Sequence, residues 1–400
     1  MAANRQSTTG KVYFNNLDGL RFFCFLMVFL FHSFHTDLAN IKDAPAFSFI
    51  KFQVFGNGFL GVNFFFVLSG FLITYLLIKE KIRNQFIHIG NFWVRRILRI
   101  WPLYFACVLY GFFIFPYTKI LAGGTPSETA NLWYYLGFIS NFDYIQNGMP
   151  DSPGLGVLWS VAIEEQFYFV WPIILSLFPV KKFWIPLAVI LMGSLVFRAL
   201  YDVPKLHEMH TLSCIGDMAL GGLGAWLILN KEGFANAIKN IPRSFIILAY
   251  AAFVFLFLFR DELLLGSYAL RIIERLLISS IMLFIILEQC YASHSFYKMS
   301  NFKIISRLGL VTYGLYCIHF IVISLVTGIS KKLGTNTELW QVLLLEPLVS
   351  LVITIAIAKL SYKYFESPFL KLKDKFDFAK IKPSPKHNTV SEQTKEPLGQ

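Results

Sequence analysis

The chain has 400 residues, of which 56% are hydrophobic and 17% aromatic, and its mean hydropathy is +0.57. This composition excludes an ordinary soluble domain, and repeated apolar runs of about 20 residues predict an all-α, polytopic helical membrane protein. The net charge of +12 does not indicate a nucleic-acid partner, because the Lys and Arg residues lie in short loops between apolar runs, where membrane orientation explains them.

About ten apolar runs are predicted to cross the membrane. The loop after the second run is the most basic one, and the excess of Lys and Arg on the cytoplasmic side of membranes therefore places both termini in the cytoplasm. The run 132–142 is too short to span and is predicted to be an interfacial or re-entrant segment of an outer loop. The predicted spans are 17–37, 58–78, 99–118, 158–179, 183–200, 213–229, 243–259, 267–289, 307–328 and 341–361.

The predicted organisation along the chain is simple. A polar cytoplasmic segment, 1–16, precedes one membrane domain, 17–370. The tail 371–400 is polar and contains proline, so it is predicted to be cytoplasmic and disordered. The five cysteines lie singly in or beside apolar runs, which predicts neither a disulfide framework nor a metal cluster.

The first span carries ionisable side chains on one predicted face. Asp18, Arg21, His32 and His35 recur at helical spacing and are predicted to share a stripe. The eleven steps from Arg21 to His32 cover roughly 16 Å of helix, about half of a ~30 Å hydrocarbon core, which places His32 near mid-depth. An ionisable group at that depth indicates a functional site. The alternative is a histidine that only hydrogen-bonds to a neighbouring helix.

Arg95, Arg96 and Arg99 come just before Trp101 and Pro102 in the third predicted span. Guanidinium groups match phosphate oxygens, so these arginines predict an anion site for a phosphate-rich ligand such as a nucleotide or coenzyme A. Two alternatives are ordinary cytoplasmic positive charge and contact with anionic lipid headgroups.

Two adjacent carboxylates, Glu164 and Glu165, lie inside the fourth predicted span, in the stretch WSVAIEEQFYFVWP. A carboxylate in hydrocarbon must be paired, hydrated or neutral, so this pair indicates a functional site. The structural alternative is a buried ion pair with Arg271 or Arg275.

Other polar residues lie along the remaining spans. Close packing of helices explains Ser69 beside Gly70 as well as a function would. Asp217, at the start of the sixth span, and His319, in YGLYCIHF, are each compatible with a polar side chain satisfied between helices. Without clustered His or Cys residues, no metal site is predicted.

Six stretches resemble, in the same order, the signatures of acyltransferase family 3, the integral membrane O-acyltransferases of bacterial cell envelopes. They are LDGLR with His32 eleven residues after its arginine, GVNFFFVLSGFLI, RRILRIWP, WSVAIEEQFYFVWP, YGLYCIH and SYKYFESPFL. The chain departs from the family pattern at Asn63, where Asp is common, and at Ile215, where the first residue of an Arg-x-Asp stretch is usual.

The resemblance implies an enzyme that transfers an acyl group, usually acetyl, from acyl-coenzyme A in the cytoplasm to a hydroxyl of a cell-envelope glycan or other surface molecule. His32 would be the general base or a transient acyl carrier, and Arg21 and Glu164 would assist it. The three arginines before Trp101 would hold the coenzyme A phosphates. The residues expected to bind substrate are Asp18, Ser69, Glu165, Tyr168, Asp217 and His319.

The implied location is the bacterial inner membrane, with membrane lipids and an envelope glycan as partners. Aromatic side chains in the outer loops 38–57 and 119–157 could stack on sugar rings, and nothing in them selects one sugar. An alternative function is a proton-coupled transporter or glycan exporter, with His32 and Glu164 as the relay. It is disfavoured because the chain shows no repeated halves and a relay does not need the three arginines. A third alternative is a non-catalytic scaffold.

Overall fold

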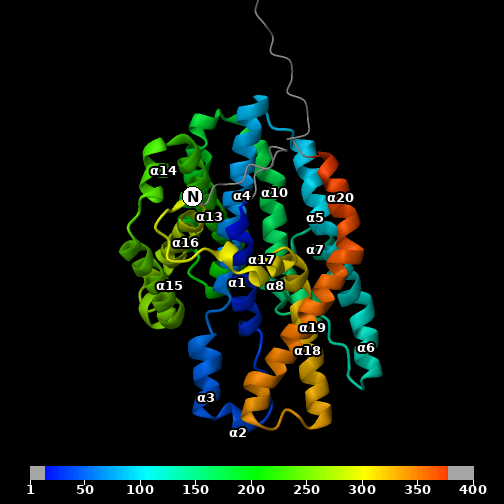
Figure 1. The fold of residues 1–400 in the computed structure, drawn as a ribbon. Coiled ribbons are helices and arrows are strands. Elements are labelled where there is room, and N and C mark those ends of the chain that lie inside the picture. The colour runs from blue at the N-terminus through cyan, green and yellow to red at the C-terminus, as the bar shows by residue number, and fades with distance from the viewer. Residues whose placement is uncertain (1–13, 377–400) are drawn as a thin grey trace, which may run out of the picture.

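The computed structural model describes residues 14–376, and within that range the chain forms helices and no β-strand. In Figure 1, α1 (Asn15–Phe31) and α4 (Leu60–Asn84) lie in the middle of a bundle of long helices. The other long helices are α5 (Ile89–Leu109), α10 (Leu158–Leu177), α11 (Trp184–Leu200), α13 (Thr211–Asn230), α15 (Arg243–Leu264), α16 (Tyr268–Tyr291), α18 (Thr312–Leu333) and α19 (Glu346–Ser361).

Shorter helices connect or extend the long ones. They are α2 (Ala39–Lys42), α3 (Pro45–Ser48), α6 (Phe115–Leu121), α7 (Leu132–Leu136), α8 (Ser140–Asn147), α9 (Pro153–Gly156), α12 (Pro204–Met209), α14 (Glu232–Lys239), α17 (Lys303–Gly309) and α20 (Ser367–Lys373). π-helical segments occur at Phe49–Val54, Tyr110–Ile114, Gln341–Leu345 and Tyr362–Glu366, and 3-10 turns at Val180–Lys182, Met299–Asn301 and Asp374–Phe376. As expected, the run 132–142 forms no helix long enough to span.

Seven helical segments within residues 14–376 are long and apolar enough to cross a membrane, which confirms a polytopic helical membrane protein. They are Leu60–Asn84, Ile89–Leu121, Val180–Leu200, Thr211–Asn230, Arg243–Leu264, Thr312–Leu333 and Gln341–Phe376. The other three predicted spans form α1, α10 and α16, which are shorter or carry more ionisable side chains. The total of about ten spans and the cytoplasmic side of both termini stay predictions. Residues 1–13 and 377–400, with the disorder expected for the tail, lie outside the described residues.

The first helix ends earlier than the sequence predicts. α1 stops at Phe31, His32 caps its end, and Phe34 adopts a left-handed φ of 68°. A left-handed residue cannot continue a right-handed helix. The prediction of one helix over 17–37, with His35 on the same helical stripe as His32, is therefore wrong.

α4 and α13 pack with their backbones in close contact at two glycines. A Cβ on Gly70 would lie 2.0 Å from the carbonyl oxygen of Met218, and a Cβ on Gly221 would lie 2.0 Å from the carbonyl oxygen of Val67. Small residues permit this approach between membrane helices. The packing explanation thus holds for Gly70, whereas its neighbour Ser69 has a polar partner on another helix.

Candidate active site

Two histidines from different helices meet inside the bundle. Nδ1 of His32, at the end of α1, lies 3.0 Å from Nε2 of His319 on α18. His319 is fully buried, whereas His32 is partly exposed, and the ring of Phe320 stacks on His32 with 4.7 Å between ring centroids. His32 therefore does hydrogen-bond to a neighbouring helix. His319 engages only Nδ1 of His32, so Nε2 of His32 remains available for chemistry.

Arg21 and Asp18 form an ion pair one turn apart, at the other end of α1. Eleven residues separate Arg21 from His32, which is roughly 16 Å along the helix. Side chains of a helix also lean towards its N-terminus, so Arg21 points away from His32. This geometry favours orientation of a substrate by Arg21 over stabilisation of an oxyanion beside His32.

The two carboxylates of α10 have different partners. Glu164 accepts a hydrogen bond from the hydroxyl of Ser69 on α4 at 2.6 Å, and Glu165 accepts one from the indole N–H of Trp101 on α5 at 2.8 Å. The side chain of Tyr168, one turn further along α10, also interacts with the Glu164 carboxyl. Ser69, Glu164 and Tyr168, which were predicted separately, therefore form one cluster.

The expected alternative, an ion pair of these carboxylates with Arg271 or Arg275, is wrong. Arg271 pairs with Asp202 at 2.5 Å, and Arg275 pairs with Asp217 at 2.8 Å. Both arginines lie on α16, which packs mainly on α15, α13 and α4 rather than on α10.

A hydrogen bond ties the histidine pair to the carboxylate cluster. The hydroxyls of Ser160 on α10 and Tyr316 on α18 are buried and lie 2.6 Å apart. Ser160 comes one turn before Glu164, and Tyr316 comes three residues before His319, so each shares a helix face with that neighbour. We name this row of side chains the polar path. It consists of His32, His319, Tyr316, Ser160, Glu164 and Ser69.

The three arginines of α5 lie in different surroundings. Arg95 pairs with the buried carboxylate of Glu80 at 3.2 Å and donates to the carbonyl of Phe376 at 2.7 Å. The guanidinium of Arg96 lies over the ring of Tyr168, and its Nε is buried without a hydrogen-bond partner among the described residues. A buried donor without a partner is costly, and a ligand atom could satisfy it.

Arg96 and Arg99 are also close enough to Glu164 to attract its carboxylate. The arginine end of α5 therefore adjoins the Glu164 end of the polar path, and His32 lies at the opposite end. The arginines of α5 and His32 thus lie at opposite ends of one row of interior polar side chains.

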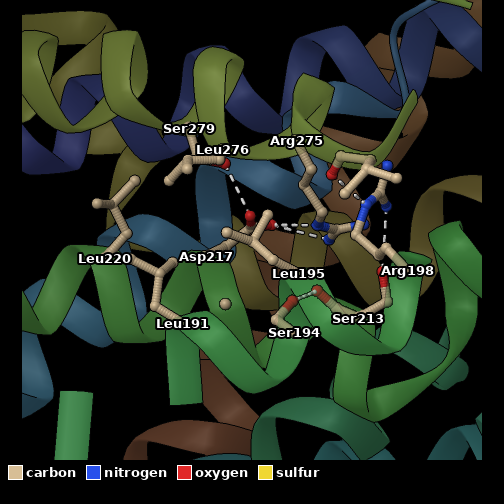
Figure 2. Close-up of a pocket in the computed structure, with 12 residues that line it drawn as sticks. Leu191, Ser194, Leu195, Arg198, Ser213, Asp217, Leu220, Arg275, Leu276 and Ser279 are labelled. Atoms are coloured by element: carbon tan, nitrogen blue, oxygen red, sulfur yellow. Dashed lines mark hydrogen bonds and ion pairs between the residues drawn. The ribbon is translucent and has the colours of Figure 1, made fainter. Parts of the chain in front are cut away.

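A second polar cluster lines a small cavity between α11, α13 and α16 (Figure 2). One carboxylate oxygen of Asp217 accepts from Arg275 at 2.8 Å, and the other accepts from Ser279 at 2.8 Å. Arg198 lies beside Arg275 and donates to Ser213 at 3.1 Å (Figure 2). The cavity volume is about 10 Å³, on the order of the space for one water molecule. Since both oxygens of Asp217 are already bonded, the geometry favours a structural role over the predicted substrate contact.

Sequence reasoning missed Ser160, Trp101 and Arg198 as members of these clusters. Arg198 is a lone arginine near the end of an apolar span, and such a residue is itself a signal of a buried polar site. Ser160 and Trp101 give no comparable signal, because serine and tryptophan are ordinary residues of membrane helices.

The polar path brings together imidazole, hydroxyl and carboxyl groups, which suit proton transfer and nucleophilic attack rather than electron transfer. Within residues 14–376, no group of three or more His, Cys, Asp and Glu side chains could hold a metal ion.

The helical membrane fold and the interior polar path define a polytopic membrane protein with a candidate catalytic histidine. Residues 14–362 match the family model described as an acyltransferase domain, and the chain belongs to this acyltransferase family. The family resemblance seen in the six sequence stretches is thereby confirmed.

Several bacterial proteins are similar to the chain. The peptidoglycan O-acetyltransferase OatA of Listeria monocytogenes is 27% identical over 396 residues, covering 92% of this chain and 57% of that protein. YrhL of Bacillus subtilis, provisionally named a peptidoglycan O-acetyltransferase, is 27% identical over 89% of this chain and 55% of its own length. A Staphylococcus aureus protein, provisionally named an O-acetyltransferase, is 28% identical over 90% of this chain and 58% of its own length. The chain thus spans little more than half the length of these relatives. No solved structure matches it.

Proposed function

We propose that the protein is a membrane O-acyltransferase that moves an acyl group, specifically acetyl, from acyl-coenzyme A to a hydroxyl of a cell-envelope glycan. Family membership supports acyl transfer, and the names of two relatives support peptidoglycan as the acceptor. The observation that carries the proposal is the pairing of His32 with His319 at one end of the polar path. A histidine held at one ring nitrogen and open at the other suits a general base or nucleophile.

In the proposed reaction, His32 takes the proton of the acceptor hydroxyl while the hydroxyl oxygen attacks the thioester carbonyl. A C–O bond forms and the C–S bond breaks. The proton then passes from His32 to the departing thiolate of coenzyme A. In a second route, Nε2 of the imidazole attacks the thioester carbonyl, the C–S bond breaks and coenzyme A departs as a thiolate. The hydroxyl oxygen then attacks the acyl carbonyl, the C–N bond breaks, and the hydroxyl proton passes to the thiolate. Glu164, held by Ser69, would assist His32 through the polar path in either route.

The donor would be held at the arginine end of the polar path. Arg96 has the unsatisfied Nε and Arg99 lies beside the same carboxyl group, so these two are the proposed ligands of the coenzyme A phosphates. Arg95 is already engaged by Glu80. It would therefore fix the start of α5 rather than bind the phosphates.

The acceptor would be bound outside the membrane, in the loops 38–57 and 119–157. Trp133 in the second loop keeps 75% of its surface exposed, which leaves its ring available to stack on a sugar. We further propose one acyltransferase domain over 17–370, with cytoplasmic segments 1–16 and 371–400, in the inner membrane of a bacterium.

The proposal is tested with purified protein in lipid vesicles, labelled acetyl-coenzyme A and a crude peptidoglycan acceptor. We expect the wild type to release coenzyme A and label the glycan, and His32→Ala to lose both activities. His294→Ala is the matched control, because His294 is exposed in a loop, and it should retain the wild-type rate.

Equal rates for wild type and His32→Ala would move the chemistry away from His32. If neither protein released coenzyme A or bound acetyl-coenzyme A, the acyltransferase proposal would fail. Proton-coupled movement of a solute with loss in Glu164→Gln would then favour the transporter alternative.

A further inference from the structure

A chain of two hydrogen bonds determines which nitrogen of His32 carries its hydrogen. Nδ1 of His319 lies 2.6 Å from the backbone carbonyl oxygen of Tyr316. A carbonyl oxygen only accepts, so Nδ1 of His319 must donate. A neutral imidazole has one N–H donor and one acceptor nitrogen, and Nε2 of His319 is therefore the acceptor. Since that nitrogen faces Nδ1 of His32 at 3.0 Å, the hydrogen of His32 lies on Nδ1.

The surroundings of His319 favour its neutral form. Its side chain is fully buried, and the rings of Phe25, Phe29 and Phe320 lie within 6.4 Å of it, measured between ring centroids. A buried charge is costly unless it is paired, and no carboxylate is hydrogen-bonded to either histidine within residues 14–376. The direction of the two hydrogen bonds is therefore fixed by burial and by the Tyr316 carbonyl.

The ring of His32 is held on two sides. Nδ1 is engaged by His319, and Phe320 stacks on the ring face at an interplanar angle of 25°. Nε2 of His32 makes no hydrogen bond to any described residue, and the side chain is only partly buried. The nitrogen that bears the lone pair is thus the one that an incoming group can reach.

We propose that His319 is a positioning residue that fixes His32 as the tautomer with hydrogen on Nδ1 and presents Nε2 as the base or acyl acceptor. The proposal rests on the acyltransferase function and replaces the predicted role of His319 as a substrate contact, because the side chain is buried and both of its ring nitrogens are already engaged. When Nε2 takes the proton of the acceptor hydroxyl, the Nδ1–H bond to His319 stabilises the imidazolium that forms. The proton leaves from Nε2 to the departing thiolate, and His319 returns to its starting state.

Two substitutions at one position separate hydrogen bonding from packing. The amide oxygen of His319→Gln can accept from Nδ1 of His32, whereas His319→Leu fills similar space without an acceptor. We expect the Gln variant to keep kcat within about tenfold of wild type. The Leu variant should lose roughly 10²–10⁴ in kcat, as expected when a catalytic histidine adopts the wrong tautomer. The KM for acetyl-coenzyme A should change little in both variants, since the arginines of α5 are untouched.

A second readout does not depend on activity. In nitrogen-15 NMR spectra of histidine-labelled protein in lipid, the His32 signals are assigned by their loss in His32→Ala. We expect Nδ1 protonated and Nε2 bare in wild type and in His319→Gln, and a mixture of tautomers in His319→Leu.

Hydrogen on Nε2 of His32 in the wild type would overturn the proposal, as would equal losses of kcat in the Gln and Leu variants or a wild-type rate in the Leu variant. If the wild type transfers no acyl group, the proposed function fails. The NMR comparison then still decides whether His319 sets the tautomer of His32.

Discussion

The guanidinium of Arg275 on α16 lies 2.8 Å from the carboxylate of Asp217 on α13, and both side chains are buried. On its own helix, the residue two positions before Asp217 is the uncharged Ile215. Arg275 therefore supplies from another helix the positive charge that the local sequence lacks. Figure 2 shows the pair beside Arg198, with Ser279 on the other carboxylate oxygen.

The first prediction concerns this pair. Arg275→Met leaves a buried carboxylate without its partner and should lower the free energy of unfolding by about 3–5 kcal/mol. Asp217→Asn should lower the free energy of unfolding by a similar amount, because Arg275 and Arg198 then remain buried without the negative charge of Asp217. The double variant should cost less than the sum of the two. Thermal or denaturant unfolding in detergent measures all three, and strictly additive losses would show that the two side chains are not coupled.

The second prediction separates Arg95 from Arg96. Arg95→Gln leaves the buried Glu80 unpaired and should destabilise the protein by about 3–5 kcal/mol, without weakening the binding of acyl-coenzyme A. Arg96→Gln should weaken that binding about tenfold or more, because a charge-assisted hydrogen bond to a phosphate is lost. Calorimetric titration with acetyl-coenzyme A checks both variants.

Glu80→Gln combined with Arg95→Gln is the control for the stability effect, because it removes the unpaired charge. We expect it to recover most of the loss. Equal affinity for acetyl-coenzyme A in Arg96→Gln and wild type would remove Arg96 from the donor site.

The third prediction concerns the contact between Glu164 and Ser69. Glu164→Gln should lower the transfer rate by about 100-fold, within the usual range for a positioned acid or base. Ser69→Ala should lower it about tenfold, since the hydrogen bond that orients the carboxyl is lost. In the Glu164→Gln background, Ser69→Ala should have little further effect. Initial rates with a saturating donor give the three comparisons.

Glu338→Gln is the control for Glu164→Gln, because Glu338 is an exposed carboxylate in a loop and its substitution should leave the rate unchanged. Independent, multiplicative losses in Glu164→Gln and Ser69→Ala would show that the two residues act separately and that the hydrogen bond does not orient the carboxyl.

The helices could be predicted from the sequence because a helix that spans a membrane needs a long apolar run. Every predicted span contains a helix in the structure. The end of the first helix could not be predicted, because it depends on the backbone conformation of Phe34. A left-handed φ at a phenylalanine is set by its tertiary surroundings rather than by local preference.

Several members of the site, among them His32, His319 and Glu164, could be predicted one by one, but their partners could not. His32 and His319 were each recognised as polar residues in apolar spans, but 287 positions separate them, and nothing in one sequence states which helices meet. The same limit explains why Arg275 was assigned to the carboxylates of α10 rather than to Asp217. Pairing depends on helix packing, which periodicity leaves open.

The last prediction uses the close contact of α4 and α13. An alanine Cβ at Gly70 would lie 2.0 Å from the carbonyl oxygen of Met218, so α13 must shift. We expect a loss of about 1–3 kcal/mol in stability, and a fall in transfer rate because the neighbouring Ser69 moves with α4.

Gly193→Ala on α11 is the matched control, since nothing lies within 4 Å of a Cβ at that position. Removing a helical glycine there should raise stability by about 0.5–1 kcal/mol and leave the rate unchanged. Unfolding midpoints and initial rates of the two variants give the comparison, and equal behaviour would show that the two helices do not need this contact.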